Sequence, residues 1–148
     1  MPITFSIELV NMHLVEKISI CGSIRRKKPE VNDADIIVLP KLNKNITGYL
    51  KNFHKCIRAG NKIVTVTYRG LDIDVYIATP ENFGVLQLIR TGSAEHNKKL
   101  CTLALKKGWK LWADGSGLRT GDGDLISNTE IGILEKLLGK YVEPEERE

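Results

Sequence analysis

The sequence predicts an α+β fold, in which helices flank a mixed, largely antiparallel sheet and a small C-terminal α/β subdomain follows. Short segments with alternating apolar residues are typical of strands. Longer segments with apolar residues three or four positions apart are typical of helices. Gly-Asp turns separate short strand candidates near the C-terminus. The 148 residues suffice for one compact unit with an ordinary hydrophobic core.

The first half of the chain supplies the predicted sheet. In the segment 17–21 the isoleucines alternate, as in a strand with one buried face. The segment 34–39 is more continuously apolar, which predicts a central strand, and it stops at Pro40. In order, we expect an amphipathic segment over 5–14, strands over 17–21 and 34–39, a helix over 45–55, and a hairpin of strands 62–68 and 71–78.

The second half is predicted to hold two helices in succession and then a small subdomain. Pro80 suits the first position of a helix that runs to about Arg90. Thr91-Gly92-Ser93 interrupts it, and Ser93 is suited to cap the next helix, which runs to about Lys107. Short strands over 109–112, 117–119 and 125–126 and a last helix over 129–138 follow. We place the subdomain boundary at this break, between 1–91 and 92–148.

Positive charge is concentrated in one segment. The formal net charge is +4, yet residues 22–69 hold eleven Lys or Arg against three acidic residues. Such an excess is typical of a protein that binds a polyanion, since each neutralised phosphate releases counterions. A merely solvated basic surface is the alternative that charge counts leave open.

Cysteine spacing and hydropathy indicate which metal ligands the protein can use and whether it can span a membrane. Cys21, Cys56 and Cys101 are widely spaced and match no zinc pattern, so we expect reduced thiols and metal binding through oxygen. No apolar run approaches the roughly 20 residues that span a bilayer. We therefore expect a soluble, cytoplasmic protein with no membrane partner, and a nucleoid or viral compartment is also compatible.

Two Asp-x-Asp pairs carry the strongest chemical signal. Asp33 and Asp35 open the apolar strand, and Asp72 and Asp74 lie in the second strand of the hairpin. Because strand side chains alternate between faces, each pair shares one face. Adjacent carboxylates repel unless a cation lies between them, and such oxygen ligands favour Mg²⁺ or Mn²⁺. The pairs predict a two-metal site, with exposed turn aspartates as the alternative.

A glycine-containing turn precedes the first pair. Gly22-Ser23 ends the first predicted strand and is followed by Arg25 and Arg26. Exposed backbone N–H groups, a hydroxyl and a guanidinium can together hold a triphosphate. Alone this is an ordinary turn, but its place shortly before Asp33 predicts that phosphates and metal meet on one nucleotide.

These motifs resemble the nucleotidyltransferase superfamily typified by DNA polymerase beta. Gly22-Ser23, Arg25-Arg26 and Asp33-x-Asp35 carry the general resemblance. Asp74, followed by Pro80-Glu-Asn-Phe-Gly84 and Thr91-Gly-Ser-Ala-Glu-His-Asn97, resembles the family X DNA polymerases in order and spacing. The stretches from Trp109 and from Tyr141 are similar to the end of their polymerase core. The resemblance runs from about residue 17 to the C-terminus.

The resemblance implies a palm nucleotidyltransferase subdomain over 1–91 and a nucleotide- and template-binding subdomain over 92–148. It makes Asp33 and Asp35 catalytic ligands of two Mg²⁺ ions, replaceable by Mn²⁺, and Asp74 the third ligand. Asp72 is left as a neighbour outside the ligand set. The expected nucleotide contacts are Gly22, Ser23, Arg26, Asn32, Thr91, Gly92 and Asn97. The expected DNA contacts are Arg25, Lys62, Arg90 and Lys98.

Two departures from the family pattern stand out. The family has an aromatic pair before Thr-Gly that packs on the nucleotide sugar, and this chain has Ile89-Arg90. The chain also begins close to the palm, and we therefore expect it to lack the family's lyase and helix-hairpin-helix domains. It resembles the minimal layout of reduced viral members, and we expect a monomer. The basic segment, or an accessory DNA-binding protein, would then grip DNA.

The predicted function is that of a DNA-directed DNA polymerase of the family X type. It would add dNMP from dNTP to a primer 3′ end by a two-metal mechanism, in short-gap repair synthesis on a DNA primer/template. One alternative is a small nucleotidyltransferase that acts on an RNA, a protein or a small molecule. Another is a nucleic-acid-binding module with an inactive site.

Overall fold

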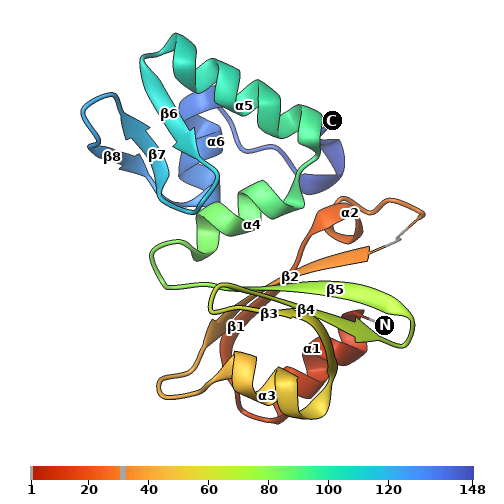
Figure 1. Ribbon diagram of the computed structural model, residues 1–148. Helices are drawn as coiled ribbons and strands as arrows, with labels where there is room; N and C mark the ends of the chain where they lie inside the picture. The colour runs from red at the N-terminus through yellow and green to blue at the C-terminus, as the bar shows by residue number, and fades with distance from the viewer. Residues whose placement is uncertain (1, 31–32) are drawn as a thin grey trace.

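A computed structural model describes residues 2–30 and 33–148, and the side chain of Asp33 lies outside the described part. Figure 1 shows a lower part built around one sheet and an upper, C-terminal part. The lower part contains α1 (Pro2–Asn11), β1 (Val15–Ile20), α2 (Gly22–Arg25), β2 (Asp33–Pro40), α3 (Ile46–Phe53), β3 (Lys55–Ala59), β4 (Ile63–Tyr68), β5 (Leu71–Ile77) and α4 (Phe83–Thr91). The upper part contains α5 (Ala94–Lys106), β6 (Trp109–Trp112), β7 (Gly117–Thr120), β8 (Leu125–Ser127), α6 (Glu130–Leu138) and a short 3₁₀ turn (Pro144–Glu146).

The lower sheet is mixed, with the strand order β1-β2-β5-β4-β3. Only β2 and β5 pair in parallel among the described strands, and the other pairs are antiparallel. The apolar strand β2 lies inside the sheet, as its composition predicts, and the hairpin β4–β5 turns at Arg69-Gly70. The predicted α+β class, with a mixed sheet and flanking helices, is confirmed.

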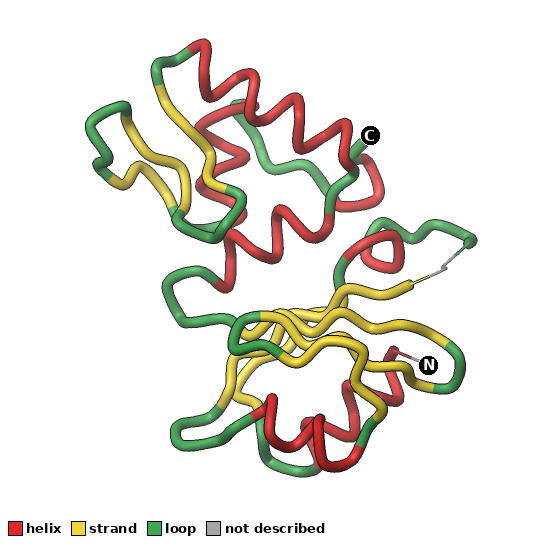
Figure 2. The backbone as a smooth tube through the Cα atoms, viewed as in Figure 1, coloured by secondary structure: helices red, strands yellow, loops and turns green. Residues whose placement is uncertain are grey.

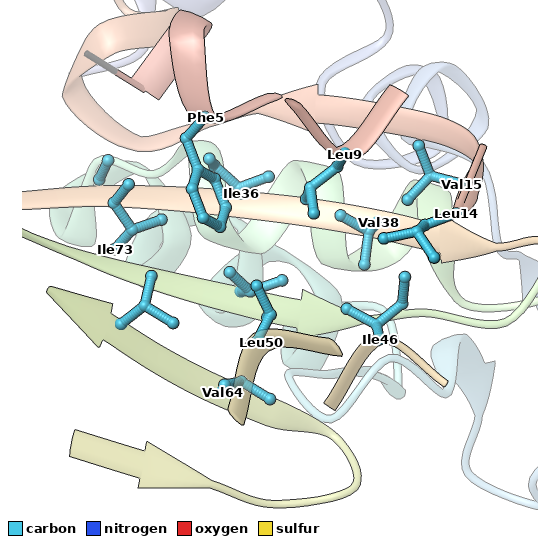
Figure 3. Close-up of a cluster of buried hydrophobic side chains, with 13 residues drawn as sticks. Phe5, Leu9, Leu14, Val15, Ile36, Val38, Ile46, Leu50, Val64 and Ile73 are labelled. Carbon is cyan, nitrogen blue, oxygen red and sulfur yellow. The ribbon is translucent and has the colours of Figure 1, made fainter. Parts of the chain in front are cut away.

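The two faces of this sheet are covered by different helices, which Figures 1 and 2 show as layers. α1 and α3 cover the lower face, where Phe5, Leu9 and Leu50 are fully buried against the sheet (Figure 3). α2 and α4 lie over the upper face. There Phe83 and Leu86 of α4 pack on residues of β2 and β5, including Ile37 and Tyr76. The sheet therefore presents alternate residues of β2 and β5 to α2 and α4.

One strand was absent from the sequence prediction. The predicted helix 45–55 ends earlier, at Phe53, and β3 follows it at the edge of the sheet. Four of the five residues of β3 are exposed, so the strand carries no alternation of apolar and polar residues. An exposed edge strand is therefore invisible to the pattern that revealed its neighbours.

The C-terminal part has its own core, to which α4 also contributes. Val85, Leu88 and Ile89 of α4 pack with residues of α5, α6 and the small antiparallel sheet β6-β7-β8. The helix break falls where the sequence predicts, and the Ser93 hydroxyl accepts a hydrogen bond from the His96 N–H at 3.3 Å. α4 thus packs against both parts of the molecule. No helix in the described ranges has the length and apolar character to cross a membrane.

His96 is a buried polar residue in the first turn of α5, with 4% of its surface exposed. Neither ring nitrogen has a hydrogen-bond partner among the described residues. Burial lowers the pKa of His96 to about 4, and the positive charges of Arg147 and Lys99 act in the same direction, against Glu130. The imidazole is therefore neutral at physiological pH.

This burial predicts an acid-sensitive fold. Below its ordinary pKa of about 6.5, His96 takes up a proton in the unfolded chain but not in the folded one. The free energy of unfolding should fall as the pH drops from 6.5 towards 4, by up to about 1.4 kcal/mol per pH unit. His96→Gln should remove this component in urea unfolding at pH 7 and pH 5, and His13→Gln, at an exposed position, should retain it. An equal pH dependence in both variants would contradict the assignment.

Candidate active site

The two Asp-x-Asp pairs lie side by side in the sheet. In the parallel pairing of β2 with β5, Asp35 is the partner of Asp74, and Asp33 of Asp72 in the backbone register. The intervening Ile36, Ile73 and Val75 are buried in the lower core. Asp35 and Asp74 therefore point to the upper face, towards α2 and α4. The side chain of Asp33 and the whole of Asn32 lie outside the described residues.

Asp74 is held in place by its neighbours on β4 and β3. The Thr65 hydroxyl donates a 2.6 Å hydrogen bond to Asp74 Oδ1, and Arg58 Nη2 lies 3.9 Å from the same oxygen. Asp72, two residues earlier, is exposed and accepts a 3.0 Å hydrogen bond from the Thr67 hydroxyl. Asp74 is about two-thirds buried and thus better fixed than Asp72.

The Gly22-Ser23 turn lies directly against Asp35. The Cys21 N–H donates a 2.7 Å hydrogen bond to the Asp35 carbonyl, and Gly22 adopts a φ of 67°. A Cβ on Gly22 would stand 3.2 Å from Asp35 Oδ2, closer than nearly all real contacts of this kind. Glycine is therefore required here both by the left-handed backbone and by the approach of the carboxylate. Ser23 follows in the first turn of α2.

Arg26 joins this turn to the break between α4 and α5. Its guanidinium donates to the carbonyl of Thr91, and its Nη1 would lie 3.0 Å from a Cβ on Gly92. Arg26 Nε has no hydrogen-bond partner in the described part of the chain. The structure therefore brings Arg26 together with Thr91 and Gly92, three of the predicted nucleotide contacts.

Arg25 is engaged within the protein. Its guanidinium forms a forked contact with the Glu130 carboxylate, through bonds of 2.5 and 2.7 Å, and donates to the Thr91 hydroxyl. Arg147, fully buried, donates to Glu130 at 2.9 Å and to the carbonyl of Val142. Burial alone raises the pKa of Glu130, but the hydrogen bonds from Arg25 and Arg147 outweigh it and lower that pKa. One carboxylate thus ties α2 to α6 and the C-terminal segment.

The other predicted contacts are distributed around the upper face. Asn97 donates to the carbonyl of Ile89 at 2.9 Å, whereas Lys98 is exposed and lies 3.4 Å from Glu95. The Arg90 guanidinium stacks on Tyr76, 4.7 Å from the ring centroid. Arg90 and Lys62 line one pocket of about 430 Å³, between the sheet and the C-terminal part. Arg90 and Lys62 thus share one pocket, whereas Asn97 and Lys98 lie on α5.

A β-bulge places two further cations on the same face. The register of β3 shifts between Cys56 and Arg58, so that Lys55 and Arg58, three residues apart, oppose Thr67 and Thr65. Regular alternation would instead put Ile57 beside Lys55 on this face. Arg58 belongs to the basic segment 22–69, but the sequence does not single it out, because β3 is not predicted.

The donor chemistry fits a divalent metal. Asp35 and Asp74 offer carboxylate oxygens from neighbouring strands at one level of the sheet, and hard cations such as Mg²⁺ take oxygen ligands. Among the side chains that the structure describes, which do not include Asp33, no group of three or more His, Cys, Asp or Glu is placed to hold a metal. The third predicted ligand, Asp33, has its side chain outside the described residues.

Comparisons with known proteins agree with this architecture. Residues 86–148 match a family model described as DNA polymerase beta thumb. Among solved structures, Leishmania infantum polymerase beta in a ternary gap complex superposes with a TM-score of 0.72 at 18% identity. The match covers 89% of this chain and 62% of that chain, so this chain spans less than two thirds of that protein. No match was found among curated proteins. The fold and the matched C-terminal domain both support the resemblance seen in the motifs.

The ionic contact at Glu130 yields a stability prediction. Glu130→Gln would leave Arg25 and the fully buried Arg147 without a balancing charge, and breaking a buried pair of this kind costs about 3–5 kcal/mol. We expect a corresponding loss in the free energy of urea unfolding. Glu135→Gln, at an exposed position of the same helix, should change it by less than about 0.5 kcal/mol. An equal free energy of unfolding in the two variants would show that the contact does not contribute to stability.

Proposed function

We propose that this family X polymerase-like protein is a nucleotidyltransferase that adds dNMP from dNTP to a primer 3′ end, as a DNA-directed DNA polymerase in short-gap repair synthesis. The observation that carries the proposal is the pairing of Asp35 with Asp74 on neighbouring strands, directly beside the Gly22-Ser23 turn. The match of residues 86–148 to a polymerase thumb favours a DNA acceptor over RNA, protein or small-molecule acceptors.

In the proposed mechanism, Asp33, Asp35 and Asp74 would hold two Mg²⁺ ions, for which Mn²⁺ could substitute. When bound, such ions acidify the attacking hydroxyl and neutralise the charge that develops on the phosphates. Thr65 fixes the Asp74 carboxylate by binding Oδ1, which leaves the other oxygen for a ligand. Gly22 holds the phosphate-binding turn against Asp35. The protein thus mainly positions charge around the reacting groups.

The nucleotide is proposed to lie on the α2 side of the aspartates. Ser23 and Arg26 would contact the triphosphate, because the hydroxyl and the guanidinium flank the turn next to Asp35. Arg26 is anchored to the Thr91 carbonyl, which connects the proposed phosphate site to the Thr91-Gly92 break. Gly22, Asn32, Thr91, Gly92 and Asn97 complete the proposed nucleotide site.

The primer is then proposed to approach from the other side, over β4 and β3. With the triphosphate on the side of β2 and α2, the attacking hydroxyl lies beyond Asp74. Arg58 stands there, 57% exposed and 3.9 Å from Asp74 Oδ1, within reach of a backbone phosphate. Lys55 lies on the same face. Lys62, Arg90 and Lys98 would extend the DNA surface, in keeping with the basic segment of the sequence.

The ligand assignment predicts different effects for two aspartates of the same strand. Asp74→Asn should lower primer extension on gapped DNA with Mg²⁺ and dNTPs by about two orders of magnitude or more, since it removes a charge needed for the metal ions. Asp72→Asn is the matched control and should retain turnover within about threefold. Wild-type turnover in Asp74→Asn would refute the metal site, and nucleotide transfer to RNA or protein alone would favour another acceptor.

The primer-side assignment predicts that Arg58→Gln weakens DNA binding. The KM for primer–template should rise about three- to tenfold. The slope of log binding constant against log salt concentration should decrease in magnitude by about one. The KM for dNTP should stay unchanged, because Arg58 lies on the far side of Asp74 from α2. Lys51→Gln on α3, beneath the sheet, is the charge-matched control. An effect on dNTP alone would contradict the placement.

A further inference from the structure

Both tryptophans of the chain line one groove on the C-terminal part. The groove measures about 400 Å³ and lies on the three-stranded sheet and the adjoining end of α5. Trp112 keeps 38% of its surface exposed, which is unusual for the largest side chain in a small domain. The lining of the groove includes Leu105, Trp109, Lys110, Trp112, Arg119 and Thr120.

The strand geometry explains why Lys110, Trp112 and Arg119 face outwards. In β6, Leu111 is buried in the core, so Lys110 and Trp112 on either side of it lie on the opposite, exposed face. Arg119 of β7 is the register partner of Lys110 and therefore shares that face. Its guanidinium is fixed by 2.9 Å bonds to the carbonyls of Ser116 and Gly123. The outer face of this sheet is thus a preformed surface.

The groove combines aromatic and positive groups. Lys110 Nζ lies 3.8 Å from the centroid of the Trp112 ring, and Lys107 Nζ lies 5.5 Å from that of Trp109. The charged residues that line the groove are Lys110 and Arg119, and no carboxylate lines it within the described structure. An exposed indole next to unbalanced cations matches a flat, apolar base attached to a phosphate chain. Duplex DNA hides its base faces and fits such a surface less well.

We infer that this groove binds single-stranded nucleic acid, with a base stacked on Trp112 and backbone phosphates at Lys110 and Arg119. Arg119 also lines a second cleft of about 380 Å³ between the sheet and the C-terminal part, where Lys62 adds a positive charge and Glu81 and Asp114 add negative ones. The groove and the cleft therefore share Arg119 as a lining residue. If the proposed function holds, the strand in the groove is the unpaired template that leads into the active site. Binding in the groove does not itself depend on that function.

The test uses the tryptophans as reporters. Because both line the groove, a 12-nucleotide oligo(dT) should quench the intrinsic fluorescence of the full chain, and oligo(U) shows whether the sugar matters. Trp112→Ala should weaken oligo(dT) binding about fivefold or more in an anisotropy titration, since stacking contributes strongly to each bound base. Lys110→Gln should weaken oligo(dT) binding. It should also reduce the magnitude of the slope of log binding constant against log salt concentration by about one. Lys136→Gln, at an exposed position of α6, should do neither.

The outcomes separate this inference from the proposed function. Asp74→Asn should lose primer extension but keep the quenching by oligo(dT) unchanged. Trp112→Ala should keep the circular dichroism of the wild type, because Trp112 lies outside the hydrophobic core of the C-terminal part. Wild-type affinity in Trp112→Ala, or equal dependence on Trp112 for a blunt duplex, would overturn the inference. Quenching by a poly-glutamate peptide but not by oligo(dT) would instead identify an acidic protein partner and overturn it as well.

Discussion

The contact of Glu130 with Arg25 and Arg147 fixes the site more than any other interaction. It spans 105 residues of sequence to α2 and reaches a fully buried arginine near the C-terminus. Burying three charges is costly, and the cost is offset only because each guanidinium meets the same carboxylate with good hydrogen-bond geometry. Once Arg25 is held, the adjoining Arg26 and Gly22 have little freedom. The position of the Gly22-Ser23 turn beside Asp35 is therefore linked to a residue in the C-terminal part.

α4 provides the apolar counterpart of this ionic contact. Phe83 and Leu86 pack on the sheet, whereas Val85, Leu88 and Ile89 belong to the C-terminal core. Because α4 packs in both hydrophobic cores, and closely packed interiors deform little, this helix fixes the position of one core relative to the other. Its last residue, Thr91, accepts from both Arg25 and Arg26. The apolar and ionic connections between the two parts converge at the Thr91-Gly92 break, beside the proposed nucleotide site.

Local periodicity in the sequence predicted much of the sheet, whereas the register between strands could not be predicted from it. The period of two placed Asp35 and Asp74 on one side of their strands, and the structure adds that they are partners across a parallel pair. No local pattern reveals the bulge that turns Arg58 towards Asp74, because one extra residue in an exposed edge strand leaves no hydrophobic trace. The sequence likewise predicts Arg25 as a DNA contact. Counting charges cannot reveal that Arg25 pairs with Glu130, which lies 105 residues later in α6.

Ile89 and Arg90, which stand where the sequence comparison expects an aromatic pair, make different contacts from neighbouring positions of α4. Ile89 is 8% exposed and packs in the C-terminal core, so an apolar side chain satisfies that position without an aromatic ring. Arg90 turns the other way, onto the Tyr76 ring, and its Nε has no hydrogen-bond partner among the described residues. Tyr76 follows Asp74 on the same face of β5, so the guanidinium adds positive charge close to the aspartates. A flat guanidinium keeps the stacking surface of an aromatic side chain and adds a charge. Arg90 therefore places a positive charge beside the aspartates, at a position where an uncharged aromatic side chain would place none.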